Sequence, residues 1–139
     1  MAQSIREVMT ADPRTVEAGA TCVDAAREMR DGDVGSIVVV DNGAVAGIIT
    51  DRDIVVRVVA GGTDPSSAKV RDAATMSPVT LTVDQSVDDA IRTMREQDIR
   101  RIPVVQDNRP AGIVSLGDLA IERDTDSALA DIASEPPNN

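Results

Sequence analysis

Two short motifs place a hydroxyl side chain three residues before a carboxylate, and both could bind a ligand. They are Thr50-x-x-Asp53 and Ser115-x-x-Asp118. Each motif follows a run of aliphatic residues and is expected to open a helix, where free backbone N–H groups and the helix dipole favour an anion. Two motifs with the same groups at the same spacing indicate two related pockets.

The same spacing also has a purely structural interpretation. A hydroxyl residue three positions before an acid forms a capping box, which stabilises the start of a helix and needs no ligand. A duplicated sequence also duplicates its caps, so recurrence alone does not separate the two interpretations. The motifs by themselves leave both open.

Both motifs belong to a repeat that covers most of the chain. Shifting the sequence by 65 positions without gaps aligns residues 5–54 with residues 70–119, and 17 of the 50 aligned positions are identical. Ordinary residue frequencies would give about four identities. Repeats of this size bury little apolar surface alone, so we expect them to pack on each other.

Composition excludes several classes of protein. A formal net charge of −10 argues against nucleic acid or anionic membrane as a partner. The chain has no His and one Cys, which excludes Ser-His-Asp and Cys-His catalysis, an intramolecular disulfide, and zinc sites built on these residues. Asp31-Gly32-Asp33 is typical of a turn and supplies no magnesium ligand set. With neither a signal peptide nor a membrane-spanning run, we expect a cytoplasmic protein.

Periodicity predicts the order β-α-β-β-α in each repeat, which is an α/β fold with pseudo-twofold symmetry. The apolar stripes of the first helices are Cys22, Ala25, Ala26 and Met29, and Val87, Ala90, Ile91 and Met94. The hairpin strands are expected at 36–40 with 44–49, and at 102–105 with 111–114. Thr50 is expected to cap a helix with apolar residues Ile54, Val55, Val58 and Val59. Ser4-x-x-Glu7 predicts a further capped helix near the N-terminus.

The expected organisation of the chain follows from these elements. We expect a first repeat with its N-terminal helix at residues 1–62, a linker at 63–68 and a second repeat at 69–123. An acidic, largely disordered tail is expected at 124–139.

This order of elements, closed in each repeat by G-h-h-[T/S]-x-x-D, resembles a pair of CBS domains, the cystathionine-β-synthase regulatory module. The likeness covers roughly residues 4–123, and Arg100-Arg101-Ile102-Pro103-Val104-Val105 is similar to the family's second strand. The resemblance implies a non-catalytic module that binds AMP, ADP, ATP or S-adenosylmethionine, with no cofactor required. It also implies a homodimer.

In related pairs a pocket combines both repeats, and its carboxylate binds the ribose hydroxyls. The resemblance therefore implies one site made of Thr15, Val34, Gly35 and Ser36 with Ser115 and Asp118. It implies a second site made of Thr80, Ile99, Arg100 and Arg101 with Thr50 and Asp53. Because Arg100-Arg101 aligns with Gly35-Ser36, we expect the arginines to add phosphate affinity and the two sites to differ. The alternative for the arginine pair is a solvated or dimer-facing role.

The chemistry of the pockets gives an expected function and one alternative. The chain has no aromatic residue, so adenine would lie between aliphatic side chains. We expect an adenylate-responsive, energy-sensing regulatory module that signals to an unknown protein partner. The alternative is a ligand-free CBS pair that docks an enzyme or a transporter.

Overall fold

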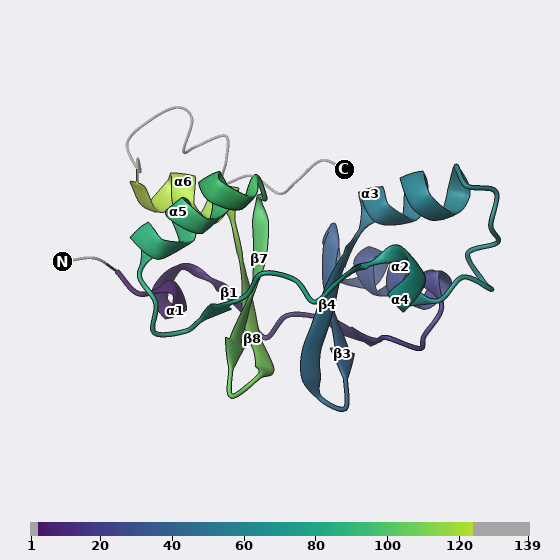
Figure 1. The fold of residues 1–139 in the computed structure, drawn as a ribbon, viewed down its shortest axis with the longest axis horizontal. Coiled ribbons are helices and arrows are strands. Elements are labelled where there is room, and N and C mark those ends of the chain that lie inside the picture. Colours follow the sequence, from purple (N-terminus) through teal and green to yellow (C-terminus); the bar gives the residue numbers. More distant parts are fainter. Residues whose placement is uncertain (1–2, 124–139) are drawn as a thin grey trace. The chain divides into compact units, whose positions relative to one another are not determined.

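The computed structural model describes residues 3–123, which form two compact units, each built on a four-stranded sheet (Figure 1). The first-repeat unit contains Pro13–Pro78 together with Asn108–Pro110. Among the described residues, the second-repeat unit contains residues 3–12, Val79–Asp107 and residues 111–123. The acidic tail expected at 124–139 lies outside the described residues.

The first-repeat unit confirms the predicted β-α-β-β-α order. Its sheet has the strand order β2-β3-β4-β5, with β2 parallel to β3 and the other neighbours antiparallel. Its elements are β2 (Thr15–Glu17), α2 (Cys22–Gly32), β3 (Ser36–Asp41), β4 (Ala44–Thr50), α3 (Asp51–Asp53), η1 (Ile54–Val59), α4 (Val70–Ala73) and β5 (Thr75–Met76).

The second-repeat unit has the same plan. Its sheet has the strand order β1-β8-β7-β6, with β6 parallel to β7 and β1 antiparallel to β8. Its elements are α1 (Ile5–Val8), β1 (Thr10–Ala11), β6 (Leu81–Thr82), α5 (Val87–Gln97), β7 (Arg101–Gln106), β8 (Arg109–Ser115) and α6 (Leu116–Arg123).

Each unit is completed by a helix and a short strand that precede the other repeat in the chain. We call α1 with β1 the first arm, and α4 with β5 the second arm. The first arm belongs to the second-repeat unit, where Ile5 is fully buried and its N–H donates to the Gln85 carbonyl at 2.8 Å. The second arm belongs to the first-repeat unit, where Val70 is fully buried and donates to the Ala20 carbonyl at 2.8 Å.

Glycines in the middle of β4 and β8 allow these arms to approach. A Cβ atom on Gly47 would lie 2.8 Å from the Thr75 carbonyl oxygen, and one on Gly112 would lie 2.7 Å from the Thr10 carbonyl oxygen. Both distances are too short for any side chain, because a backbone oxygen cannot move without its strand. The glycine of the repeated A-G-h-h motif is therefore required for strand pairing.

Both hairpins turn through two residues with positive φ. In the first hairpin Asn42 and Gly43 have φ of 55° and 82°, and in the second Asp107 and Asn108 have φ of 54° and 66°. Two adjacent residues with positive φ match the right-handed twist of the strands that they join. Asn, Asp and Gly adopt this conformation more readily than other residues, which explains their presence at both turns.

The helices of each unit lie on one side of its sheet and bury the predicted apolar stripes, with one correction (Figure 1). In α2, Cys22, Ala25 and Met29 are buried, but Ala26 is exposed. Its counterpart Ile91 in α5 is only half-buried. The stripe that contacts the sheet is narrower than the sequence indicates, and this position lies at its edge in both helices.

The helix expected after Thr50 differs from the prediction. Only Asp51–Asp53 is α-helical, and η1 continues as a π-helix in which the Ala60 N–H donates to the Val55 carbonyl at 2.9 Å. Ile54 and Val58 are buried, whereas Val55 and Val59 are 58% and 57% exposed. The wider π turn changes which side chains face the sheet. The β-branched side chains of this segment have few χ1 rotamers with which to turn back toward it.

Candidate functional site

In the first-repeat unit, part of the predicted site gathers at one end of the β3–β4 hairpin. Ser36 pairs directly with Thr50, and the Asp51 N–H donates to the Gly35 carbonyl at 3.0 Å. Gly35 is buried, whereas Val34, just before it, is 40% exposed. Thr15 begins the neighbouring parallel strand and pairs with Val38, two residues beyond Ser36.

The second-repeat unit brings the equivalent residues together. The Leu116 N–H donates to the Arg100 carbonyl at 2.8 Å, so the start of β7 lies beside Ser115 at the end of β8. Arg100 is exposed and Arg101 is half-buried. Thr80 directly precedes β6, and Ile99 donates its N–H to the Met94 carbonyl at 3.1 Å.

Both hydroxyl–carboxylate motifs form capping boxes. The Thr50 N–H donates to Oδ2 of Asp53 at 2.9 Å, and the Asp53 N–H donates to Oγ1 of Thr50 at 3.1 Å. Ser115 and Asp118 repeat these bonds at the same two distances. In both motifs the cap uses Oδ2, and all four residues are half-buried.

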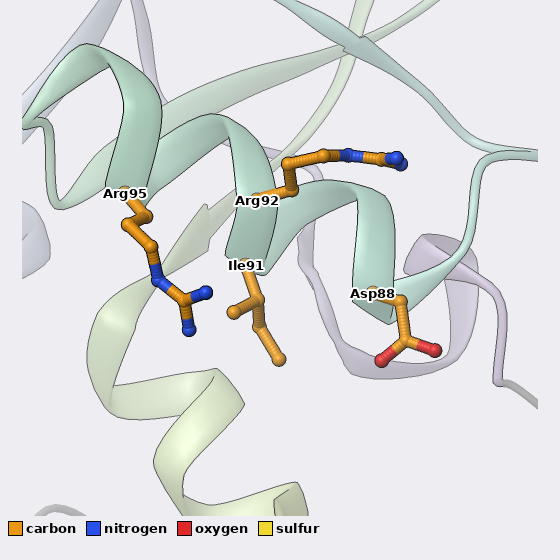
Figure 2. A pocket seen from close by; sticks show the side chains of 4 residues that line it. All are labelled: Asp88, Ile91, Arg92 and Arg95. Carbon is orange, nitrogen blue, oxygen red and sulfur yellow. The ribbon is translucent and has the colours of Figure 1, made fainter.

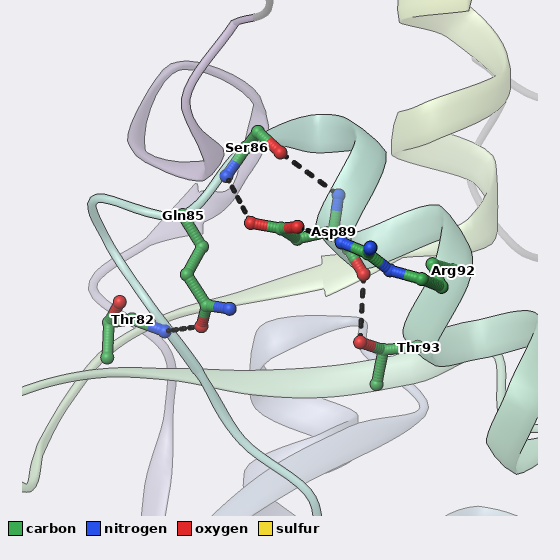
Figure 3. Close-up of polar contacts among 6 residues, drawn as sticks. All are labelled: Thr82, Gln85, Ser86, Asp89, Arg92 and Thr93. Atoms are coloured by element: carbon green, nitrogen blue, oxygen red, sulfur yellow. Dashed lines mark hydrogen bonds and ion pairs between the residues drawn. The ribbon is translucent and has the colours of Figure 1, made fainter.

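Capping boxes of the same kind also occur away from the predicted site residues. Thr21 with Asp24 caps α2, and Ser86 with Asp89 caps α5. Figure 3 shows the α5 box, in which Asp89 also pairs with Arg92. Four boxes in 121 described residues show that a hydroxyl three residues before Asp is, in this chain, first a helix-start signal. A ligand role for Asp53 and Asp118 needs evidence beyond the motif.

The caps also account for the shifted acidities of the α2 and α5 aspartates. The pKa of Asp24 is lowered chiefly because the Thr21 backbone N–H donates to its carboxylate. The Ser86 backbone N–H lowers the pKa of Asp89 in the same way, with Arg92 contributing. Burial, followed by the charge of Asp72, raises the pKa of the Cys22 thiol, as expected for a buried thiol of low reactivity.

Arg57 lies beside Asp53 and was not among the predicted site residues. Its Nε lies 3.9 Å from Oδ1 of Asp53, and its Nη1 donates to the Ala73 carbonyl at 3.0 Å. The Asp53 side chain is only 15% exposed, whereas that of Arg57 is 53% exposed. The spacing of four residues along the predicted helix made such a pair possible, but the position of the guanidinium also depends on the Ala73 carbonyl of α4.

A groove along α5 lies outside all predicted site residues. Asp88, Ile91, Arg92 and Arg95 line about 480 Å³, and Figure 2 shows Asp88, Ile91 and Arg95 on one side of the helix. The residues form a polar, open surface around one aliphatic side chain. Their spacing of three and four residues predicts one face of a helix, but it does not indicate a groove on that face.

Among residues 3–123, no three His, Cys, Asp or Glu side chains gather closely enough to hold a metal ion. In the same part of the chain, no helix has both the length and the apolar character to cross a membrane.

The chain matches known proteins over nearly its whole length. The family model described as "CBS domain" matches twice, at residues 5–60 and 70–123. The uncharacterized protein YlbB of Bacillus subtilis is 41% identical over 135 residues, which cover 93% of this chain and 90% of YlbB.

Two solved structures have a similar fold. A crystal structure of Hypoxic Response Protein I with two coordinated zinc ions is 32% identical with a TM-score of 0.77, covering 85% of this chain and 97% of that one. The CBS domain pair of protein MJ0100, in complex with 5′-methylthioadenosine and S-adenosyl-L-methionine, has a TM-score of 0.81 at 23% identity, covering 91% and 100%. At that identity the second likeness concerns the fold alone.

Proposed function

Since this chain belongs to the CBS-domain family, with two copies of the domain in tandem, we propose that it binds adenosine-containing ligands through Asp53 and Asp118. CBS-domain pairs are generally regulatory, and the family that matches is not a catalytic family. The proposed role is that of a non-catalytic module that responds to AMP, ADP, ATP or S-adenosylmethionine and signals to a protein partner.

The observation that carries this proposal is the position of the two carboxylates. Each is half-buried at the same end of its hairpin, and its cap engages Oδ2. Oδ1 can therefore accept a ribose hydroxyl while the helix start stays capped. A hydrogen bond to a charged acceptor contributes roughly 1.5–3 kcal/mol, enough to select a sugar with free hydroxyl groups.

Other groups would bind the remaining parts of the ligand. Arg100 and Arg101 would bind phosphate oxygens, for which a guanidinium is well shaped. Adenine would lie between aliphatic side chains, because the chain has no aromatic residue. The contributions of Thr15, Val34, Thr80 and Ile99 remain predictions from the family resemblance.

Calorimetry with matched variants separates a ligand role from a capping role. Asp53→Asn and Asp118→Asn should each remove or weaken one binding event for AMP, ADP, ATP or S-adenosylmethionine. Asp24→Asn and Asp89→Asn are the controls, because they alter the same kind of cap in α2 and α5. They should lower stability by a similar amount and leave binding unchanged. Equal binding by all four variants would contradict the proposal.

A second candidate function is a ligand-free module that docks an enzyme or a transporter. The observation in its favour is that Thr50–Asp53 and Ser115–Asp118 form capping boxes without a ligand, as Thr21–Asp24 and Ser86–Asp89 do. A thermal-shift screen decides between the two. Saturation at one hundred times Kd stabilises a fold by ~2.7 kcal/mol, so any bound nucleotide raises the melting temperature. If AMP, ADP, ATP, S-adenosylmethionine and NAD all leave it unchanged, the second candidate is favoured.

The proposed module would act as a homodimer in the cytoplasm. A bound ligand can change its signal only if it binds two arrangements of the protein with different affinity. Light scattering with and without AMP measures both the oligomeric state and its response. A monomer under both conditions would contradict the dimer.

A further inference from the structure

Arg57 bonds to the second arm and also lies beside the proposed ribose-binding carboxylate. Its Nη1 donates to the carbonyl of Ala73, the last residue of α4, at 3.0 Å. The last carbonyls of a helix have no partner within that helix, so this bond caps α4 from a different element. The Nε of the same guanidinium lies 3.9 Å from Oδ1 of Asp53. One side chain thus interacts with the end of the arm helix and with the carboxylate.

The two interactions of Arg57 are not equally tight. The bond to the Ala73 carbonyl has the length of an ordinary hydrogen bond, whereas 3.9 Å between Nε and Oδ1 is an ion pair without one. The guanidinium is planar and rigid, so fixing Nη1 restricts where Nε can lie. The Asp53 side chain is 15% exposed, but that of Arg57 is 53% exposed, so water weakens the ion pair. Its strength therefore depends on what occupies the space around Oδ1.

A ribose at Asp53 would strengthen this ion pair. The cap engages Oδ2, which leaves Oδ1, the atom near Arg57, as the acceptor for a sugar hydroxyl. A sugar bound there would displace water from around the two charges. Coulomb attraction increases as the local dielectric falls, so the guanidinium would be held more firmly. Because the same group donates to the Ala73 carbonyl, the end of α4 would be held more firmly as well.

The second arm is the part of the first-repeat unit that leads into the other unit. Val70 anchors it in the core, and β5 pairs with β4 through Met76 and Gly47. The chain leaves β5 at Met76 and enters the second-repeat unit at Val79. A ligand that changes how firmly the arm is attached therefore acts on the segment that joins the two repeats.

We infer that Arg57 is a positioning residue that couples ligand binding at Asp53 to the attachment of the second arm. The inference rests on the proposed function and adds its regulation, since an occupied Asp53 fastens α4 and β5. Arg57 belongs to the π-helix η1, and π turns are frequent at functional sites. Because coupling between two sites is reciprocal, a firmly attached arm also raises the affinity of Asp53 for its ligand.

Hydrogen exchange in the whole chain measures the attachment of the arm. The backbone N–H groups of Val70, Arg71 and Ala74 each donate to a carbonyl, and their exchange is compared with that of β3, which reports opening of the whole unit. Without ligand, Arg57→Gln should speed exchange of these arm amides about 3- to 10-fold, because it removes one hydrogen bond. Saturating AMP should slow them relative to β3 in the wild type, but not in Arg57→Gln.

The control for the exchange experiment is Arg52→Gln. Arg52 is an exposed arginine in α3, so its replacement changes the charge equally and should leave the effect of AMP on the arm as in the wild type. Loss of the effect in both variants would show that net charge, not the bond to Ala73, is responsible. Faster arm exchange when AMP is added to the wild type would also overturn the inference.

Calorimetry tests the reciprocal effect. Val70→Ala loosens the arm and should weaken AMP, at the binding event that Asp53→Asn removes, by about 3- to 10-fold. In the Arg57→Gln background the same substitution should weaken AMP clearly less, because the connection is already broken. Ala73→Gly, which loosens α4 through its backbone and keeps the carbonyl, replaces Val70→Ala if that variant does not fold.

The outcomes separate this inference from the proposed function. If Asp53→Asn removes an event but loosening the arm weakens AMP equally in both backgrounds, the inference is wrong and the proposed function stands. If Asp53→Asn changes the binding of none of AMP, ADP, ATP and S-adenosylmethionine, the ligand role of Asp53 is wrong and the coupling falls with it.

Discussion

The two units share one architecture, and they differ in charge where β3 and β7 begin. Both have a capped α-helix of eleven residues, a two-residue turn with positive φ, a glycine under the arm strand and a capping box after the hairpin. They differ at Gly35-Ser36 against Arg100-Arg101. The kept residues have structural explanations, so identity between the repeats marks the requirements of folding. Arg100 and Arg101 give the second repeat two cations that the first repeat lacks at the aligned positions.

The closing helices are a second difference. The first-repeat unit ends its hairpin with the short α3 and the π-helix η1, whereas the second-repeat unit has α6 at the same place. The consecutive valines of η1 include three with about half of their surface exposed, Val55, Val56 and Val59. A hairpin followed by a capping box can therefore lead into either a π-helix or an α-helix.

The largest effect is expected from removing the buried residue of an arm. Ile5→Ala should lower the free energy of unfolding by about 2–5 kcal/mol, because it opens a cavity in the second-repeat core. Val70→Ala is its counterpart in the first-repeat core and should cost roughly 2 kcal/mol. Native-state hydrogen exchange should show Ile5→Ala loosening β7 and β8, and Val70→Ala loosening β3 and β4. Loosening of β3 and β4 by Ile5→Ala would overturn the exchange of arms between the units.

A methyl group on the glycine that faces an arm strand should destabilise the protein in either unit. Gly47→Ala and Gly112→Ala each place a Cβ atom against a backbone oxygen, so urea unfolding should show losses of roughly 1–3 kcal/mol. Gly19→Ala is the matched control, since the nearest atom to its added Cβ is a side-chain nitrogen of Arg71 at 3.7 Å. Losses no greater than that of the control would show that the arm strands tolerate a side chain.

The caps of α2 and α5 should contribute similarly. Thr21→Ala and Ser86→Ala each remove the side-chain acceptor for an N3 backbone N–H, at a cost of about 1 kcal/mol. Thr63→Ala, an exposed threonine in the connector, should be nearly neutral in the same urea titrations. If one substitution lowers the free energy of unfolding clearly more than the other, the two caps differ in a way that their hydrogen-bond distances do not show.

The smallest effect concerns acid pH. The folded-state pKa values of Asp24 and Asp89 are lowered, so their contribution to stability is present above the ordinary aspartate pKa of about 4 and is lost as the pH falls through the lowered values. Melting temperatures measured from about pH 6 downward should therefore fall below about pH 4. Asp24→Asn and Asp89→Asn should each reduce the slope of this fall. An unchanged slope in both variants would show that other carboxylates cause it.

Sequence patterns were sufficient for most structure that depends on neighbours along the chain, and the π-helix η1 is the exception. The capping boxes, the hairpin turns and the β-α-β-β-α order follow from residues within a few positions of each other. The 65-residue alignment could also have identified α4, because it pairs residues 70–73 with α1. For the candidate site, the predicted hairpin accounts for Ser36 lying beside Thr50, whereas the grouping of site residues across the two repeats stays a prediction. The hairpin did not indicate Arg57, whose position depends on the Ala73 carbonyl of a separate element.

Local sequence therefore determined the elements of this protein, their caps and the two positions of a carboxylate beside a hydroxyl. Only the tertiary structure decided that each arm completes the sheet of the other repeat, that Ala26, Val55 and Val59 face solvent, and that a guanidinium lies beside Asp53. The physical reason is that capping and turn formation are short-range interactions encoded within a few residues. Strand pairing, burial and charge placement depend on distant segments whose meeting no local pattern specifies.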